Sequence, residues 1–319
     1  MSTEPLPPSQ PDFVDQRAGL IVFGVLEIII GCLCALMVPL MLFGMAVQGA
    51  SGGVATDRGM MVFCAMYYGA IAAAFIWLGI GSILCRRWAR ALLLIISWSW
   101  LLVGVLVTGV FMVMFPQMMD QMPPGAGQAA FTVTMVMLTC MFLVVPGVMT
   151  FFYMRKNVKA TCEARDPVRR WTDACPLPVL AMSVMMGCGA PMMLAMSFTR
   201  MNVMPFCGVL ITGLPATLLF VVMAVLWGWL AWALYRLKPV GWWIAVIAFV
   251  LLGVSGTITF ARVDMMDMYR QMGYPQQQID QLQKFNFFQG KAMVVWMACC
   301  MVPWLGYLLW IKKFFRRSA

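Results

Sequence analysis

Histidine is absent from this chain of 319 residues. That absence removes the commonest zinc and copper(II) ligand, the usual axial ligand of haem and the base of a Ser-His-Asp triad. A Ser-Lys or carboxylate mechanism needs no histidine, but no Ser or Asp stands beside a candidate base within the apolar stretches. We therefore predict that the protein is not an enzyme and carries no cofactor.

Charged residues are also scarce, at 11% of the chain, whereas hydrophobic residues make up 63%. So few polar side chains cannot cover the surface of a water-soluble globule. The composition therefore predicts a lipid bilayer as the environment. The net charge of +10 is typical of basic loops beside membrane spans, so we expect no nucleic-acid partner.

Eight apolar stretches are long enough to cross a bilayer core of about 30 Å, which takes roughly 20 helical residues. Lipid favours helices here because every backbone polar group must find a partner, and no alternating strand pattern is visible. The predicted spans are 19–47, 60–84, 91–114, 131–154, 177–198, 206–234, 240–260 and 292–311.

The basic residues predict the orientation of these spans. The connections and chain ends put sixteen of the 22 Lys and Arg residues on one side of the membrane and six on the other. By the positive-inside rule, both termini are cytoplasmic, which agrees with an even number of spans. We expect the protein in the bacterial inner (cytoplasmic) membrane.

The two halves of the chain resemble each other. A shift of 150 places Trp77 on Trp227 and Arg86 on Arg236, and a shift of 157 places Pro146 on Pro303. Each half crosses an even number of times, so the halves would be parallel repeats related by an axis along the membrane normal.

The sequence thus predicts an all-α integral membrane protein with eight transmembrane helices in two parallel four-helix repeats. The first repeat covers residues 19–154 and the second covers residues 177–311. The remaining segments are a disordered cytoplasmic tail, a cytoplasmic linker and a basic cytoplasmic tail, at 1–18, 155–176 and 312–319.

Glu27 lies within the first predicted span, in the stretch FGVLEIIIGC. Burying a carboxylate in lipid is costly, so an intramembrane acid is a candidate functional site by default. It could be a protonatable or cation-coordinating group. It could also be structural, reaching back to the interface or hydrogen-bonded to a neighbouring span. The fifth to eighth spans contain no acid, which favours the structural interpretation.

Methionine is abundant, with 33 residues. Its thioether sulfur is a soft ligand that selects copper(I), and two clusters follow the predicted third and seventh spans. The candidate metal ligands are Met118, Met119, Met122, Met265, Met266, Met268 and Met272. Methionine is also an adaptable filler of apolar packing, and its spread through nearly all spans favours that role.

These features predict a non-catalytic polytopic membrane protein, a scaffold or accessory subunit of a membrane complex, with other membrane-protein subunits as partners. The spans hold few of the polar residues that line a water-filled path. The alternative is a transporter or channel built from parallel repeats, for a soft metal ion such as Cu(I) or an apolar small solute.

Overall fold

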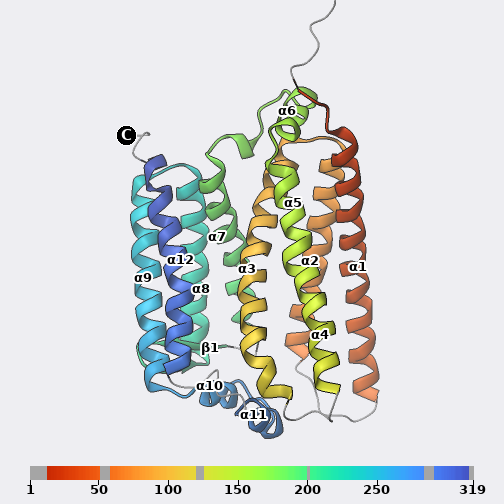
Figure 1. Ribbon diagram of the computed structural model, residues 1–319. Helices are drawn as coiled ribbons and strands as arrows, with labels where there is room; N and C mark the ends of the chain where they lie inside the picture. Colours follow the sequence, from red (N-terminus) through yellow and green to blue (C-terminus); the bar gives the residue numbers. More distant parts are fainter. Residues whose placement is uncertain (1–12, 51–57, 120–125, 200–201, 284–290, 316–319) are drawn as a thin grey trace, which may run out of the picture.

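The computed structural model describes residues 13–50, 58–119, 126–199, 202–283 and 291–315, and these form long helices with one small hairpin (Figure 1). In chain order the elements are α1 (Arg17–Ala50), α2 (Arg58–Ile83), α3 (Arg87–Met119), α4 (Ala126–Thr139), the π-helical turn η1 (Cys140–Val144), α5 (Val145–Met154), α6 (Lys156–Arg165), the 3-10 turn η2 (Trp171–Asp173), α7 (Leu177–Met196), β1 (Val203–Phe206), β2 (Val209–Thr212), α8 (Leu214–Tyr235), α9 (Pro239–Arg262), α10 (Met265–Gln271), α11 (Gln276–Gln283) and α12 (Lys291–Phe315).

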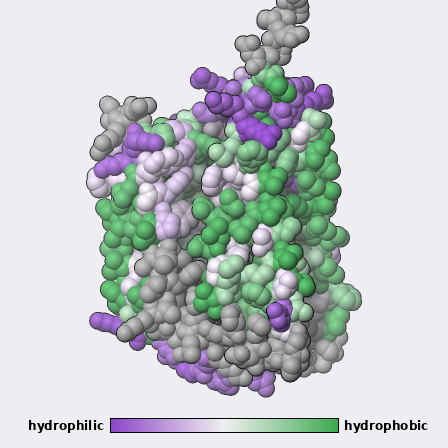
Figure 2. Space-filling view, in the orientation of Figure 1, coloured by the Kyte–Doolittle hydropathy of each residue, from purple (hydrophilic) through white to green (hydrophobic). Residues whose placement is uncertain are grey.

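Seven helices in the described part of the chain are long and apolar enough to cross a membrane. They are α1, α2, α3, the continuous α4–η1–α5 helix, α7, α8 and α9, and they match the first seven predicted spans. In Figure 2, apolar residues cover much of the visible flank, and hydrophilic residues gather at its two ends. The chain is therefore an all-α integral membrane protein. The eighth predicted span lies within α12, which is a helix of 25 residues.

The helices form two groups that lie side by side (Figure 1). In one group α1 packs along α2, and α3 packs against α5. In the other α7 packs along α8, and α9 packs along α12. The ends of the molecule are named here by their short helices: α6 lies at the α6 end, and α10 and α11 lie at the opposite, α10 end.

One apolar core joins the two groups near the α6 end. It contains Leu93 of α3, Tyr153 of α5 and Leu180 of α7, which are all fully buried. A second core lies within the other group and includes Leu230 and Trp242, with the Trp242 indole N–H donating to the Leu308 carbonyl at 2.7 Å. The groups are thus packed on each other through α3 and α7.

The predicted sixth span, 206–234, begins too early. Residues 203–212 form an antiparallel hairpin in which Val203 pairs with Thr212 and Phe206 with Val209. Its two-residue loop, Cys207 and Gly208, has positive φ at both positions, as a type I′ turn requires. Short apolar strands cannot be told from the start of an apolar helix by composition alone, which is why the sequence missed this hairpin. The helix itself starts at Leu214.

The hairpin loop is held against α9 by two hydrogen bonds. The Cys207 amide donates to Ser255 Oγ at 2.8 Å, and the Gly208 amide donates to Thr259 Oγ1 at 2.9 Å. These hydroxyls give partners to loop amides next to apolar surface, where an unpaired amide is costly. Two small polar residues of a membrane helix thus have a structural role.

The connections α2–α3 and α8–α9 are turns with the same hydrogen bonds. The Arg86 amide donates to the Gly81 carbonyl at 2.8 Å, and the Lys238 amide donates to the Ala233 carbonyl at 2.9 Å. Such a bond across five residues is typical of a Schellman motif, which ends a helix on a left-handed residue. The left-handed residues are Cys85 and Leu237, with φ of 55° and 54°. Each residue number in the second turn exceeds its counterpart by 152.

Beside each of these turns, one glycine and one alanine make a close contact between two helices. The glycine lies on the first helix at one turn and on the second helix at the other. A Cβ added to Gly81 would lie 2.6 Å from the Ala89 Cβ, and one added to Gly241 would lie 2.6 Å from the Ala233 Cβ. Position 81 corresponds to 233 and position 89 to 241 at the shift of 152. In both turns, therefore, the contact accommodates one glycine and one alanine but no larger pair.

The contact between α1 and α2 depends on small residues seven positions apart. On α1 these are Gly24 and Gly31, and on α2 they are Ala72 and Gly79, both buried. A Cβ at Gly24 would lie 2.7 Å from the Gly79 carbonyl oxygen, and one at Gly31 would lie 3.0 Å from that of Ala72. Small residues bring helix backbones together in lipid, where van der Waals packing contributes strongly to association.

We therefore expect Gly79→Ala to lower the free energy of unfolding by about 1–3 kcal/mol, the usual cost of overpacking. Its added Cβ would meet the Gly24 carbonyl oxygen at 2.6 Å. Gly109→Ala on α3 is the matched control, because nothing lies within 4 Å of its added Cβ. The control should be neutral or stabilising by up to about 1 kcal/mol, through helix propensity. Unfolding in mixed detergent micelles measures both, and equal effects would contradict the packing described.

Candidate functional site

Glu27 lies in the contact between α1, α2 and α5, and its side chain is fully buried. The Tyr153 hydroxyl donates to Glu27 Oε1 at 2.9 Å. The Tyr153 oxygen also lies 2.9 Å from Ser82 Oγ, and the Ser82 hydroxyl donates to the Leu20 carbonyl at 3.0 Å. This Glu27–Tyr153–Ser82 chain therefore links three helices through polar contacts.

The number of protons available shows which protonation state of Glu27 satisfies every contact in the Glu27–Tyr153–Ser82 chain. Its three oxygen-to-oxygen contacts need three protons, and the hydroxyls of Tyr153 and Ser82 supply two of them. When Glu27 is a carboxylate, Tyr153 donates to it and one of the other two contacts lacks a proton. When Glu27 is in its acid form, the direction of that bond reverses: the carboxyl donates to Tyr153, Tyr153 donates to Ser82, and all three contacts have a proton. The other carboxyl oxygen, Oε2, has no hydrogen-bond partner among the described residues. A neutral carboxyl is also the form that an apolar surrounding favours.

The Glu27–Tyr153–Ser82 chain lies close to the α6 end of the membrane helices. Ser82 and Tyr153 are the next-to-last residues of α2 and α5. Glu27 is ten residues after Arg17, or about 15 Å along α1 at ~1.5 Å per residue. Glu27 thus has a hydrogen bond to a neighbouring span, as the structural interpretation of this residue expects. Sequence reasoning missed Ser82 and Tyr153, because neither residue type is unusual near the end of an apolar helix.

The second group of helices has an apolar side chain at the position that corresponds to Ser82. At the shift of 152 that relates the two turns, Ser82 corresponds to Leu234. Leu234 is fully buried in an apolar cluster with Met186 of α7 and Ile311 of α12. The second group therefore lacks the hydroxyl that Ser82 contributes, although the Ser183 hydroxyl of α7 donates to the Ala231 carbonyl of α8 at 2.7 Å.

The segment 155–176, predicted as a linker, folds onto the α6 end as α6 and η2. The Arg165 guanidinium pairs with Asp15 at 2.6 Å, and the Gln16 amide donates to Thr161 Oγ1 at 3.0 Å. The Tyr235 hydroxyl at the end of α8 donates to the Trp171 carbonyl at 3.0 Å. The segment therefore contacts the start of α1 and the end of α8, which belong to different groups of helices.

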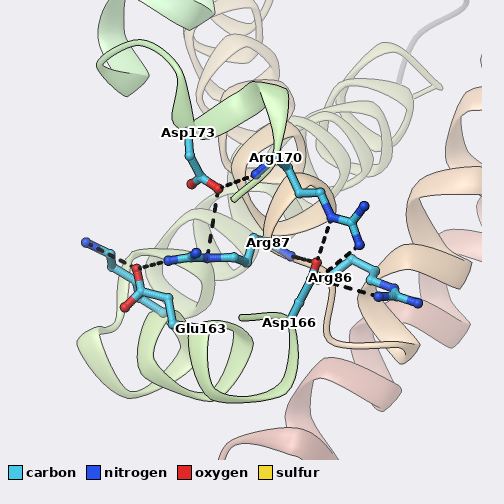
Figure 3. Close-up of polar contacts among 7 residues, drawn as sticks. Arg86, Arg87, Glu163, Asp166, Arg170 and Asp173 are labelled. Carbon is cyan, nitrogen blue, oxygen red and sulfur yellow. Dashed lines mark hydrogen bonds and ion pairs between the residues drawn. The ribbon is translucent and has the colours of Figure 1, made fainter. Parts of the chain in front are cut away.

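Asp166 is the centre of the charge cluster in this segment (Figure 3). Its side chain is only 2% exposed. It accepts hydrogen bonds from the Arg170 guanidinium at 3.1 Å and from the Arg87 amide at 3.4 Å, and it pairs with Arg86 at 3.5 Å. Burial raises the pKa of Asp166, but these hydrogen bonds and charges outweigh it and hold the pKa below its ordinary value of 3.8.

The described methionines of the proposed metal site lie at the α10 end. Met265, Met266 and Met268 are in α10, where Met266 is fully buried, and Met272 directly follows that helix. Met118 and Met119 are the last residues of α3, and their side chains lie outside the described part, as does Met122 altogether. No group of three or more Cys, Asp or Glu residues suitable for a metal ion occurs among the described residues.

The described part of the chain contains a cavity at the α6 end and an apolar groove, and the Glu27–Tyr153–Ser82 chain lines neither. The cavity measures about 300 Å³ and lies between α3, α6 and η2. The groove measures about 260 Å³ and lies between α9 and α12, lined by residues such as Gly253, Thr257 and Met301. Glu27, Tyr153 and Ser82 are therefore separate from both.

Comparison with known proteins gives no relative: no family model, no curated protein and no solved structure matches the chain significantly.

If Glu27 is a neutral hydrogen-bonding group, Glu27→Gln should keep nearly the wild-type free energy of unfolding, because an amide N–H can replace the carboxyl proton. Glu27→Leu should lower the free energy of unfolding by about 1–3 kcal/mol, since the buried Tyr153 hydroxyl then loses its hydrogen-bond partner at position 27. Unfolding in detergent micelles measures both variants. A Gln variant as unstable as the Leu variant would show that the carboxyl is needed as a charge.

The Asp166 cluster predicts a loss of stability at acid pH. Because the folded-state pKa lies below 3.8, the stabilising contribution is complete above that value and declines as pH falls through the lower, folded pKa. Asp166→Asn should lower the free energy of unfolding by about 1–3 kcal/mol at neutral pH, because charged hydrogen bonds are lost. It should also make stability decline less steeply as the pH falls. The exposed Asp280 provides the control variant Asp280→Asn. Thermal unfolding between about pH 3 and 7 would contradict the prediction if both variants gave the same curve.

Proposed function

We propose that the protein is a non-catalytic polytopic membrane protein that acts as a scaffold or accessory subunit of a membrane complex. The observation that carries this proposal is the fully buried Glu27–Tyr153–Ser82 chain. A carboxyl in a transport path needs contact with water or solute, whereas Glu27 contacts the hydroxyl of a neighbouring helix and lines neither cavity. Its chemistry here is to join helices.

The proposed architecture is eight membrane spans, with α12 as the eighth, in two parallel four-helix repeats. Two features support the duplication. The pairs α1–α2 and α3–α5 correspond in order to α7–α8 and α9–α12. The turns α2–α3 and α8–α9 share their hydrogen bonds and left-handed residues. At these turns the matching shift is 152, two residues more than the 150 inferred from the sequence.

We propose that the α6 end faces the cytoplasm and that the membrane is the bacterial inner membrane. The chain brings many basic residues to this end, including Arg86, Arg87 and Arg90 near the start of α3 and Lys312 and Lys313 near the end of α12. Such an excess of Lys and Arg is typical of cytoplasmic connections. Both termini are then cytoplasmic.

The folded segment at the α6 end is the part of the protein best suited to hold partner subunits. It is fixed by the ion pairs around Asp166 and Arg87 and contacts both groups of helices. Val168 and Trp171 are exposed on it, at 59% and 46%. A rigid surface with a few exposed apolar side chains suits a polar, transient type of interface.

The proposal predicts that the tagged full-length chain, extracted in a gentle detergent, is recovered with other membrane proteins that mass spectrometry identifies. A tagged, unrelated polytopic protein expressed at the same level is the control for lipid-mediated carry-over. Recovery of the chain alone as a monomer would contradict the subunit role. If, in addition, replacing Met118, Met119, Met265 and Met266 by Leu lowered copper(I) uptake by cells, the transporter would replace the scaffold as the proposed function.

A further inference from the structure

The cavity at the α6 end contains an arginine, Arg90, that forms no ion pair within the described part of the chain. It measures about 300 Å³ and is lined by Arg87, Arg90, Lys159, Glu163, Thr172 and Asp173, among others. Three of these six side chains are basic and two are acidic, so the lining carries one net positive charge. This cavity is more polar than the groove between α9 and α12. It lies where the apolar spans of α3 and α7 begin.

Arg87 takes up both acids of the lining. Its guanidinium lies 3.0 Å from Glu163 and 3.9 Å from Asp173, as Figure 3 shows. Lys159 also pairs with Glu163, at 3.8 Å. The structure gives Arg90 no ion pair, and the buried Arg90 Nε has no hydrogen-bond partner among the described residues. The residue as a whole is partly exposed, and Glu163 and Asp173 act on its charge through space without an ion pair. A partly buried guanidinium without a direct counter-ion is costly, so an anion from outside the chain would stabilise it.

A second side chain of the same cavity also lacks a partner. Thr172 is only 4% exposed, and its hydroxyl oxygen has no hydrogen-bond partner among the described residues. The two thiols of the lining do not supply the missing anion, because burial raises the pKa of Cys162 to about 12 and that of Cys175 to about 11. An unpaired cation and an unpaired hydroxyl therefore line one cavity.

We propose that this cavity binds a phosphate group of one negative charge, with Arg90 donating to its oxygens and Thr172 donating its hydroxyl proton. A planar guanidinium fork suits phosphate oxygens, and basic pockets between membrane helices bind anionic lipid headgroups. Two sources offer this chemistry: the phosphodiester of an anionic lipid and a soluble phosphate. The depth of the cavity favours the lipid, because Ala91 and Leu177 of its lining belong to membrane spans.

The test uses the purified full-length chain, stripped of lipid, in a neutral detergent. The probes are dioctanoyl phosphatidylglycerol, zwitterionic dioctanoyl phosphatidylcholine and inorganic phosphate. Phosphatidylglycerol should raise the Tm through binding to the folded state, and phosphatidylcholine should not. Arg90→Met should raise the Tm without lipid, because it removes a partly buried charge without a direct counter-ion, and should weaken phosphatidylglycerol binding about tenfold or more. This opposite pair of effects separates a ligand-binding arginine from a merely structural one.

Arg236→Met is the matched control, since Arg236 is exposed at the same end of the other helix group and does not line the cavity. It should leave binding unchanged. Thr172→Val serves if Arg90→Met does not fold, and it should weaken binding by about three- to tenfold through one lost hydrogen bond.

The possible results separate the two sources and the two proposals. If inorganic phosphate alone raises the Tm and Arg90→Met removes that rise, the site is upheld with a soluble phosphate as its ligand. Binding that is equal for both lipids, or unchanged in Arg90→Met and Thr172→Val, overturns the site. The site requires a membrane location but no scaffold role, so recovery of the chain without partner subunits leaves it intact.

Discussion

Lipid offers no hydrogen bonds, and this constraint explains most polar contacts of the structure. A polar group placed among the membrane helices is stabilised by a partner within the chain. Glu27 finds Tyr153, and the amides of the hairpin loop find hydroxyls on α9. The Trp242 indole finds a carbonyl of α12. Glu27 Oε2, Thr108 Oγ1 and Thr150 Oγ1 have no partner among the described residues, and neither has Arg90 Nε. Arg90 differs from them because it is a cation that lines a cavity beside a second group without such a partner, the Thr172 hydroxyl.

The two helix groups solve the same packing problem with different chemistry. Both end their second helix in the same left-handed turn and fill the tight contact beside it with one glycine and one alanine. Ser82 contributes a hydroxyl to the first group, whereas Leu234 contributes only apolar volume to the second. Backbone geometry at these turns is therefore alike in the two groups, while the polar contacts beside them differ. A transport path shared by two repeats would more naturally use equivalent groups from both.

The segment between the groups connects their α6 ends rather than merely spacing them. Its ion pairs fix it to the starts of α1 and α3, and Tyr235 fixes the end of α8 to it. The same residues line the cavity: Arg87 pairs with Glu163 and Asp173, while Arg90 forms no ion pair among the described residues. One set of charged residues thus both fixes this segment and lines the cavity.

Hydropathy and composition were sufficient to predict the membrane environment, the approximate bounds of seven spans and Glu27 as a candidate site. These depend on sums of hydropathy along the chain, or on one acid in an apolar run. The tertiary structure alone decided that Ser82 and Tyr153 meet Glu27, that residues 203–212 form a hairpin and that the linker encloses a cavity. It also decided that small residues seven positions apart join α1 to α2. Each of these depends on how helices rotate and approach one another, and hydropathy carries no information about either.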